Sequence, residues 1–500
     1  MKAKSIMIAG TMSSAGKSFI TAGLCRIFKQ DGYKTAPFKA QNMALNSYVT
    51  ADGLEIGRAQ AMQAEAAGIM PDIRMNPILL KPVSEKGSQV IVNGEVRANM
   101  NAAEYYRHKT DFITYIMNDY NSLADDYDII VLEGAGSPAE INLKSVDIVN
   151  MGMAKMSHSP VLLVGDIDRG GVFASLYGTV ELMDDYEKSM IKGLIINKFR
   201  GDISILKSGL DMIEKLTSKP VLGTVPYIQT DIDDEDSLSE RLLSRKIGGN
   251  ADIAVIRLPH ISNFTDFNVF GIIDGVSVRY VSQAHELGDP DLIIIPGTKN
   301  TMADLLWLRQ SGLEAMILKK NSKKIPIFGI CGGFQMLGRK ISDPCNAENG
   351  GSLNGIGLLD TETVFENSKK RSLAEGKILN ADGIFRDISE IHVRGYEIHM
   401  GTTKKCGENA VPFTVLDDGR TDGFRNADST VFGSYLHGIF DNEEFVRRII
   451  SAVLDKKGID SKIPDFSLKE YKEKQYDILA DELRKALDMD RIYKILNEGL

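Results

Sequence analysis

One cysteine stands in a sequence context that suits nucleophilic catalysis. An apolar run that is typical of a buried strand ends at Ile330, Cys331 follows it, and Gly332 and Gly333 precede an amphipathic run. This order is typical of a nucleophile elbow, in which a sharp turn lifts the sulfur out of the sheet. A helix N-terminus also favours the thiolate form of a cysteine. The pattern Gly-x-Cys-x-Gly-x-Gln from Gly329 to Gln335 therefore predicts a catalytic cysteine rather than a buried structural one.

A cysteine nucleophile needs a base, and the chain has seven histidines. We predict that His437 is the base, because it ends a strand-like run and can face the elbow across the carboxyl edge of a sheet. His399 ends a second such run and is the rival, whereas His260 and His392 have weaker contexts. An oxyanion hole would come from two backbone N–H groups, those of Gly297 and Gly332.

The N-terminal stretch from Gly10 to Ser18 has the context of a phosphate-binding loop. It follows a short apolar strand, Ser5 to Ala9, and precedes an amphipathic run, Phe19 to Gln30. Loop N–H groups and the helix N-terminus would cradle phosphates, Lys17 would reach the terminal phosphates and Ser18 would ligate Mg²⁺. The loop is one residue longer than the usual pattern. The predicted nucleotide contacts are Gly10, Thr11, Ser14, Ala15, Gly16, Lys17, Ser18, Asn197 and Lys198.

Short apolar strands alternate with helical runs through the first half of the chain, which predicts a doubly wound parallel sheet. Functional side chains of such sheets collect at the carboxyl ends of the strands. Glu133 ends one strand and would hold Mg²⁺ together with Ser18, and Asp52 is a further candidate ligand. Asn197 and Lys198 end another strand and are similar to the Asn-Lys pair that P-loop proteins use at the nucleotide base.

Side-chain donors gather in two stretches of the first half. Neutral amides together with lysines suit a substrate that presents carboxylates and amides. A solvated loop is an equally good interpretation for any one of these residues. The predicted substrate contacts are Lys39, Gln41, Asn42, Asn46 and Lys81.

Composition excludes several classes of function. The chain has 500 residues, too many for one core, and its 43% hydrophobic and 25% charged residues are ordinary for a globular protein. A formal net charge of -9 argues against nucleic acid or an anionic membrane as the main partner. Four scattered cysteines, with neither metal-type spacing nor a disulfide framework, and the lack of a membrane-length apolar run predict a cytoplasmic protein.

Two boundaries divide the chain. A strongly acidic and then basic segment, Thr230 to Asn250, predicts an exposed linker. New strands follow at Asp252 to Leu258 and Asp291 to Gly297, with one helix expected over Met302 to Lys320. The tail, Ser467 to Leu500, has helical spacing and mixed charge, which favours docking on the protein's own surface. We expect domains at 1–245 and 250–447 and a helical tail at 460–500.

With these motifs in place, the chain resembles the cobyric acid synthase family of cobalamin biosynthesis over nearly its whole length. Gly10 to Ser18 is similar to the longer P-loop of dethiobiotin synthetases, and Glu133 to Leu143 and Gly165 to Gly171 look particular to the family. Gly329 to Gln335 and the Tyr-Leu-His-Gly run that contains His437 are similar to class I glutaminases. In those enzymes the histidine is followed by Pro-Glu, and the glutamate is the third member of the catalytic triad. In this chain Gly-Ile follows His437, so the identity of the third member is open, with Glu397 and Asp441 as candidates.

The resemblance implies an α/β protein with a P-loop amidoligase domain, a flavodoxin-like class I glutamine amidotransferase domain and a short helical tail. It implies that Cys331 and His437 release ammonia from glutamine. ATP with Mg²⁺ would convert the b, d, e and g carboxylates of adenosylcobyrinic acid a,c-diamide into acyl phosphates that ammonia displaces. The implied partners are the small-molecule substrates, and neither nucleic acid nor a membrane is expected to bind. No tightly bound organic cofactor is expected. The resemblance leaves open whether the protein forms a homo-oligomer.

Three other functions are alternatives to this interpretation of the sequence. The main competitor is an amidotransferase of the same type that acts on another carboxylate, such as the a and c positions of cobyrinic acid. A ParA/MinD-like ATPase is a different class, but such proteins carry an extra lysine where this chain has Met12. A binding module that has lost its glutaminase is a further alternative, and the intact Cys331 and His437 argue against it.

Overall fold

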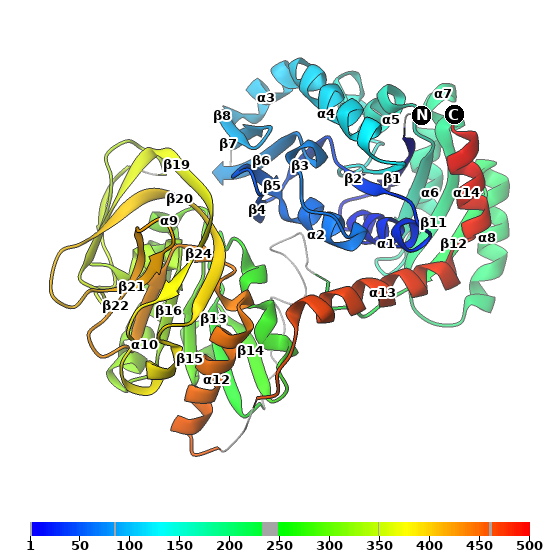
Figure 1. The fold of residues 1–500 in the computed structure, drawn as a ribbon. Coiled ribbons are helices and arrows are strands. Elements are labelled where there is room, and N and C mark those ends of the chain that lie inside the picture. Colours follow the sequence, from blue (N-terminus) through cyan, green and yellow to red (C-terminus); the bar gives the residue numbers. More distant parts are fainter. Residues whose placement is uncertain (1–2, 85–86, 233–248, 349, 460–462) are drawn as a thin grey trace. The chain divides into compact units, whose positions relative to one another are not determined.

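The computed structural model describes residues 3–84, 87–232, 249–348, 350–459 and 463–500. Contacts divide the chain into two compact units (Figure 1). The first unit consists of Met1–Ala44, Leu54–Asp233 and Lys469–Leu500, and the second consists of Leu45–Gly53 and Asp234–Leu468. Most of the predicted linker lies outside the described residues, because these omit 233–248. Within the described ranges, no helix combines the length and apolar character that a membrane crossing requires.

A six-stranded parallel sheet forms the centre of the first unit. Its strand order is β12-β11-β10-β1-β9-β2, with β1 between β9 and β10. Most of these residues are buried, as expected for apolar strands covered on both faces. The doubly wound parallel sheet predicted from the sequence is therefore confirmed. The strands are β1 (Lys4–Gly10), β2 (Thr35–Phe38), β9 (Ile129–Glu133), β10 (Val161–Asp166), β11 (Ile191–Phe199) and β12 (Val221–Pro226).

Helices connect these strands, and a smaller sheet adds to the unit. The small sheet has the order β3-β6-β7-β8 and was not expected from the sequence. Its strands are β3 (Gln41–Met43), β6 (Ile78–Ser84), β7 (Gly87–Val92) and β8 (Glu95–Asn101), and β5 (Glu55–Gly57) precedes α2. The helices are α1 (Lys17–Gln30), α2 (Arg58–Ala67), α3 (Ala102–His108), α4 (Ile113–Asp126), α5 (Met151–Ser157), α6 (Val172–Glu181), α7 (Asp185–Met190) and α8 (Ile203–Thr217).

The C-terminal tail folds onto the first unit. Its helices α13 (Leu468–Ala486) and α14 (Met489–Glu498), red in Figure 1, belong to the same apolar cluster as α1. Arg26 of α1 forms ion pairs with Glu473 and Asp477 of α13, at 2.6 and 2.8 Å. Leu479 and Leu483 of α13 are fully buried. The predicted docking of the tail on the protein's own surface is therefore confirmed.

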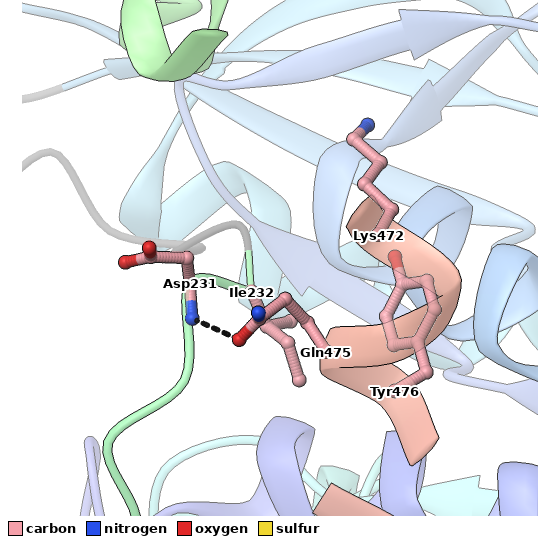
Figure 2. A pocket seen from close by; sticks show the side chains of 5 residues that line it. All are labelled: Asp231, Ile232, Lys472, Gln475 and Tyr476. Carbon is pink, nitrogen blue, oxygen red and sulfur yellow. Dashed lines mark hydrogen bonds between the residues drawn. The ribbon is translucent and has the colours of Figure 1, made fainter. Parts of the chain in front are cut away.

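A small pocket lies where α13 meets the chain that follows β12 (Figure 2). The N–H of Asp231 donates a hydrogen bond to Oε1 of Gln475, at 3.0 Å. The cavity has a volume of about 10 Å³, room for roughly one water molecule, so it is too small for a substrate. The pocket is lined by Asp231, Ile232, Lys472, Gln475 and Tyr476.

The second unit is built on a mixed sheet. Its parallel part has the order β14-β13-β15-β16-β23, and the strands beyond β23 pair antiparallel except for β17 and β19, which are parallel. The strands are β4 (Ser47–Val49), β13 (Ala251–Ile256), β14 (Val276–Val281), β15 (Leu292–Ile295), β16 (Ile327–Ile330), β17 (Lys340–Asp343), β18 (Gly351–Asn354), β19 (Thr361–Ile378), β20 (His392–Lys405), β21 (Val411–Leu416), β22 (Thr421–Arg425), β23 (Val431–Ser434) and β24 (Leu436–His437).

One predicted helix of this unit is wrong in its length. The run from Met302 to Lys320 forms two helices, because the chain breaks at Gly312, whose φ of 78° lies in the left-handed region. Glycine adopts that conformation without a steric penalty, so it ends the first helix there. The helices of the second unit are α9 (Thr301–Gln310), α10 (Leu313–Ser322), α11 (Gly332–Leu337) and α12 (Glu443–Lys456).

Candidate active sites

The phosphate-binding loop joins β1 to α1 at the carboxyl edge of the first sheet. Gly16 has a φ of 98°, and a Cβ there would lie 2.0 Å from Nδ2 of Asn197, so only glycine fits. The Lys17 ammonium is buried and donates to the carbonyl oxygens of Met12 and Gly136, at 3.0 and 3.1 Å. The loop therefore has the compact shape and the enclosed lysine that phosphate binding requires.

Two residues from the end of β11 contact this loop. Asn197 donates to the carbonyl oxygen of Ala15 at 2.9 Å, and the Lys198 ammonium donates to that of Ser14 at 2.7 Å. Lys198 also pairs with Asp166, from the end of β10, at 2.9 Å. The structure thus brings the Asn-Lys pair to the P-loop, whereas its contact with a nucleotide base stays a prediction.

Glu133 ends β9 beside the P-loop and is 1% exposed. Its Oε1 accepts hydrogen bonds from Ser18 Oγ at 2.7 Å and from Lys39 Nζ at 2.8 Å, and its Oε2 accepts one from Gln63 at 2.5 Å. These donors compensate for the burial of a carboxylate. Ser18 and Glu133 present hard oxygen atoms at one spot, which fits Mg²⁺. Lys39, predicted to bind substrate, is paired with Glu133 here.

Three more of the predicted substrate residues lie in the small sheet of the first unit. Gln41 accepts a hydrogen bond from the Tyr105 hydroxyl at 2.6 Å, and Asn42 donates to Oε1 of Gln60 at 3.0 Å. Lys81 pairs with Glu55 at 2.5 Å. All three side chains are buried. Their role in substrate binding stays a prediction.

The last two predicted residues of the first half belong to the segment grouped with the second unit. Oδ1 of Asn46 accepts the N–H of Asn263 at 2.6 Å. Asp52 is exposed in the turn that follows β4. The proposed contact of Asp52 with Mg²⁺ therefore stays a prediction.

The elbow around Cys331 has the backbone strain that the sequence pattern predicts. Cys331 joins β16 to α11 with φ 52° and ψ -108°, a conformation that costs energy for a residue with a side chain. A Cβ on Gly333 would lie 2.0 Å from the carbonyl oxygen of Ile295, so glycine is required there. Beneath the turn, Phe328 of β16 stacks on Phe432 of β23 with ring centroids 4.6 Å apart. This packing holds the elbow in place.

His437 lies beside Cys331 and is 1% exposed. Its Nδ1 is 2.7 Å from Oδ2 of Asp266. Because Asp266 occupies Nδ1, the nitrogen left for Cys331 is Nε2. Burial alone would lower the pKa of His437, but the Asp266 carboxylate and the neighbouring Cys331 side chain raise this pKa to about 10. The arrangement favours an imidazolium next to the sulfur.

Asp266 was not predicted from the sequence. It lies in the 3₁₀ helix Phe264–Ile272, and its Oδ1 also accepts the N–H of Gly438 at 3.2 Å. The sequence indicated two other carboxylates, those of Glu397 and Asp441, as candidates for the third member of the triad. Glu397 forms ion pairs with Lys370 and Arg420. Asp441 follows His437 in the chain, as the glutamate of common glutaminases does, but the carboxylate bonded to the imidazole is that of Asp266.

The rival histidines have other surroundings. His399 stacks on Tyr435 with ring centroids 3.7 Å apart, and its Nδ1 is 3.1 Å from the carbonyl oxygen of Gly401. Burial lowers the pKa of His399. His260 pairs with Asp304 at 2.7 Å, and His392 is exposed at the start of β20. The geometry therefore favours His437 as the base.

The two predicted oxyanion residues lie close to this centre. A Cβ on Gly297 would lie 3.0 Å from Cε1 of His437, which places the Gly297 backbone against the imidazole. A Cβ on Gly332 would lie 3.2 Å from the backbone nitrogen of Thr298. Gly332 opens α11, where N–H groups point away from the helix. The structure thus brings both residues to the elbow, and their role as donors stays a prediction.

We expect Asp266→Asn to lower the kcat of glutamine hydrolysis by as much as about 10⁴-fold, because the amide no longer fixes the tautomer and charge of His437. Asp441→Asn is the matched control and should retain most of the activity. Rates of glutamate release from both variants check this. A loss with Asp441→Asn and none with Asp266→Asn would contradict the assignment.

The same substitution should change the pH dependence of stability. The raised pKa of His437 contributes stability that is fully present below about pH 6.5, the ordinary histidine value, and that disappears as the pH rises through about 10. The free energy of unfolding should therefore differ most between the native protein and Asp266→Asn at low pH. Chemical denaturation at several pH values measures this difference, and a gap that widens toward pH 10 would contradict it.

Comparison with known proteins identifies the families of both domains. Residues 6–238 match the model of the CobQ/CobB/MinD/ParA nucleotide binding domain, and residues 252–445 match that of the CobB/CobQ-like glutamine amidotransferase domain. A cobyric acid synthase of Ruminiclostridium cellulolyticum is 58% identical over 100% of this chain and 98% of its own length. That of Lachnoclostridium phytofermentans is 55% identical over 100% of both chains. The chain therefore belongs to the cobyric acid synthase family and is a glutamine-dependent amidating ligase.

Proposed function

We propose that this chain amidates the b, d, e and g carboxylates of adenosylcobyrinic acid a,c-diamide to give adenosylcobyric acid, a step of cobalamin biosynthesis. The observation that supports the proposal is that one chain of this family holds two clusters of polar side chains that suit the two half-reactions. One cluster is Cys331, His437 and Asp266, and the other is Lys17 and Ser18 with Glu133.

The second unit supplies ammonia. The Cys331 sulfur, whose proton passes to His437, attacks the carboxamide carbon of glutamine, and the N–H groups of Gly297 and Gly332 stabilise the oxyanion that forms. His437 gives its proton to the departing nitrogen, so ammonia leaves and a glutamyl thioester remains. The imidazole then takes a proton from water, which attacks the thioester, and returns a proton to the Cys331 sulfur as glutamate is released. Asp266 holds the ring in the required orientation throughout, because it binds Nδ1.

The first unit activates the acceptor. A carboxylate is a poor electrophile, because its oxygen is a poor leaving group. Transfer of the terminal phosphoryl group of ATP to a carboxylate oxygen gives an acyl phosphate, and ammonia then displaces phosphate to form the amide. Lys17 lies in the loop where it would stabilise charge on the transferring group. Mg²⁺ held by Ser18 and Glu133 would neutralise phosphate charge, and Lys39 would then be released from Glu133 toward the acceptor.

Mass spectrometry of candidate acids incubated with ATP, Mg²⁺ and glutamine tests the choice of acceptor. Adenosylcobyrinic acid a,c-diamide should lose about one dalton at each of four successive amidations. Cobyrinic acid that lacks the a and c amides is the matched control acid and should not be amidated at those two positions. Rapid amidation at a and c, with none at b, d, e and g, would overturn the proposal in favour of the other acceptor.

A further inference from the structure

The segment Leu45–Gly53 lies within the sequence of the first unit but packs with the second. The chain leaves the first unit after Ala44, following β3, and rejoins it at Leu54, just before β5. Between these points, Asn46, Ser47, Val49 and Thr50 are buried. Tyr48 and Val49 pack in an apolar cluster with Tyr396 and Ile398 of β20. A piece of the ATP-binding part of the sequence is therefore built into the glutaminase unit.

The first contact of this segment is a reciprocal pair of asparagines. Oδ1 of Asn46 accepts the N–H of Asn263 at 2.6 Å, and Oδ1 of Asn263 accepts the N–H of Ser47 at 3.0 Å. Asn263 has a φ of 52°, in the left-handed region, and it caps the 3₁₀ helix that carries Asp266. The N–H of Asp266 donates to the carbonyl oxygen of Asn263 at 3.0 Å. The pair thus fixes the turn that presents Asp266 to His437.

The second contact joins the segment to β20, and residues of β20 in turn contact His437 and Cys331. The Tyr396 hydroxyl donates to the carbonyl oxygen of Ser47 at 3.2 Å. The Tyr396 ring lies parallel to that of His437, with centroids 5.3 Å apart and 22° between the planes. The carbonyl oxygen of Ile398, two residues along β20, is 3.7 Å from the Cys331 sulfur. The segment therefore contacts a direct neighbour of each of the three groups.

We propose that the segment Leu45–Gly53 positions the Cys331–His437–Asp266 centre, with Asn46 and Asn263 as its positioning residues. Glutamine hydrolysis then depends on a stretch of chain that is continuous at both ends with the ATP-binding unit.

Asn46→Ala separates this role from the substrate contact that the sequence predicts for Asn46. If Asn46 positions Asp266, we expect the kcat of glutamine hydrolysis to fall about tenfold or more, with little change in the KM for glutamine, because the substitution removes the buried acceptor of the Asn263 N–H. Amidation with free ammonia should keep its rate and its KM for the acceptor. A raised KM for the acceptor with normal glutamine hydrolysis would overturn the proposal in favour of substrate binding.

A second pair of variants tests the other half of the asparagine pair. Asn263→Gly removes the acceptor for Ser47 while tolerating the left-handed backbone, so it should lower the same kcat. Asn263→Asp keeps a side-chain acceptor and tolerates the left-handed backbone, so it should retain most of the native kcat of glutamine hydrolysis. Glu390→Gly is the matched control, because Glu390 has a φ of 67° and pairs with Lys377 at the surface of the same unit.

Glutamate release without any acceptor measures these effects independently of the substrate assignment. If the corrinoid proposal fails, the loss in Asn46→Ala and Asn263→Gly should remain. Wild-type glutamine hydrolysis in Asn263→Gly, or equal losses in Asn263→Asp and Asn263→Gly, would overturn the positioning role. An equal fall in glutamine- and ammonia-dependent amidation would also overturn it, because that result indicates general loss of the fold.

Discussion

Glutamine-dependent amidation by Cys331→Ser should fall by about 10³-fold or more, whereas amidation with free ammonia should stay close to the rate of the native enzyme. The serine hydroxyl is a far weaker nucleophile than the cysteine sulfur. The P-loop, Lys17 and Glu133 belong to the other unit, so activation of the acceptor does not use the sulfur. Amide formation with each nitrogen source, measured side by side, gives the two rates.

Cys406→Ser is the control for this experiment, because Cys406 is an exposed free cysteine of the same unit. It should retain both activities. Loss of both activities in Cys331→Ser, with correct folding shown by circular dichroism, would refute the division of labour between the two units. Full glutamine-dependent activity in Cys331→Ser would refute the nucleophile.

Lys17→Ala should lower amidation with either nitrogen source by about 10²- to 10³-fold, because the loss of one preorganised cation from the phosphate loop removes stabilisation of the transferring phosphoryl group. Glutamine hydrolysis without an acceptor should persist, since Cys331, His437 and Asp266 lie in the second unit. Amide formation and glutamate release from the same sample measure both effects.

Lys29→Ala is the matched control, because Lys29 lies in the last turn of the same helix and is partly exposed, 3.8 Å from Glu473. It should amidate at close to the native rate. Amidation with free ammonia at the native rate in Lys17→Ala would contradict this prediction, because ATP would then activate the acceptor without the P-loop lysine.

The local motifs were predictable because their chemistry depends on neighbours in the sequence. Cys331 needs a preceding strand and following glycines, and Lys17 needs a strand, a glycine loop and a helix. The periodicity of apolar residues indicates all of these elements. The alternation of strands and helices likewise predicts the parallel sheet of the first unit, which brings the P-loop, Glu133 and Asn197 to one edge.

Residues joined only by the tertiary fold could not be predicted in this way. The strands β14, β15 and β16 and the helices α9 and α10 separate Asp266 from Cys331 in the chain, and nothing in its local sequence marks Asp266 as a partner of His437. The segment Leu45–Gly53 contains donor residues that suit a substrate, but its packing with the second unit depends on contacts made with Asn263 and Tyr396. The break at Gly312 was missed because the apolar spacing continues across it.

The central claim is that ammonia released at Cys331 becomes the amide nitrogen of an acceptor activated at the P-loop. Mass spectrometry of the product formed from the corrinoid acid, ATP, Mg²⁺ and glutamine with a heavy-nitrogen amide tests this claim most directly. We predict that every new amide carries the heavy nitrogen, and that Cys331→Ser with the same glutamine and unlabelled ammonia gives only light amides. Light amides from the native enzyme in ammonia-free buffer, or heavy amides from Cys331→Ser, would contradict the account.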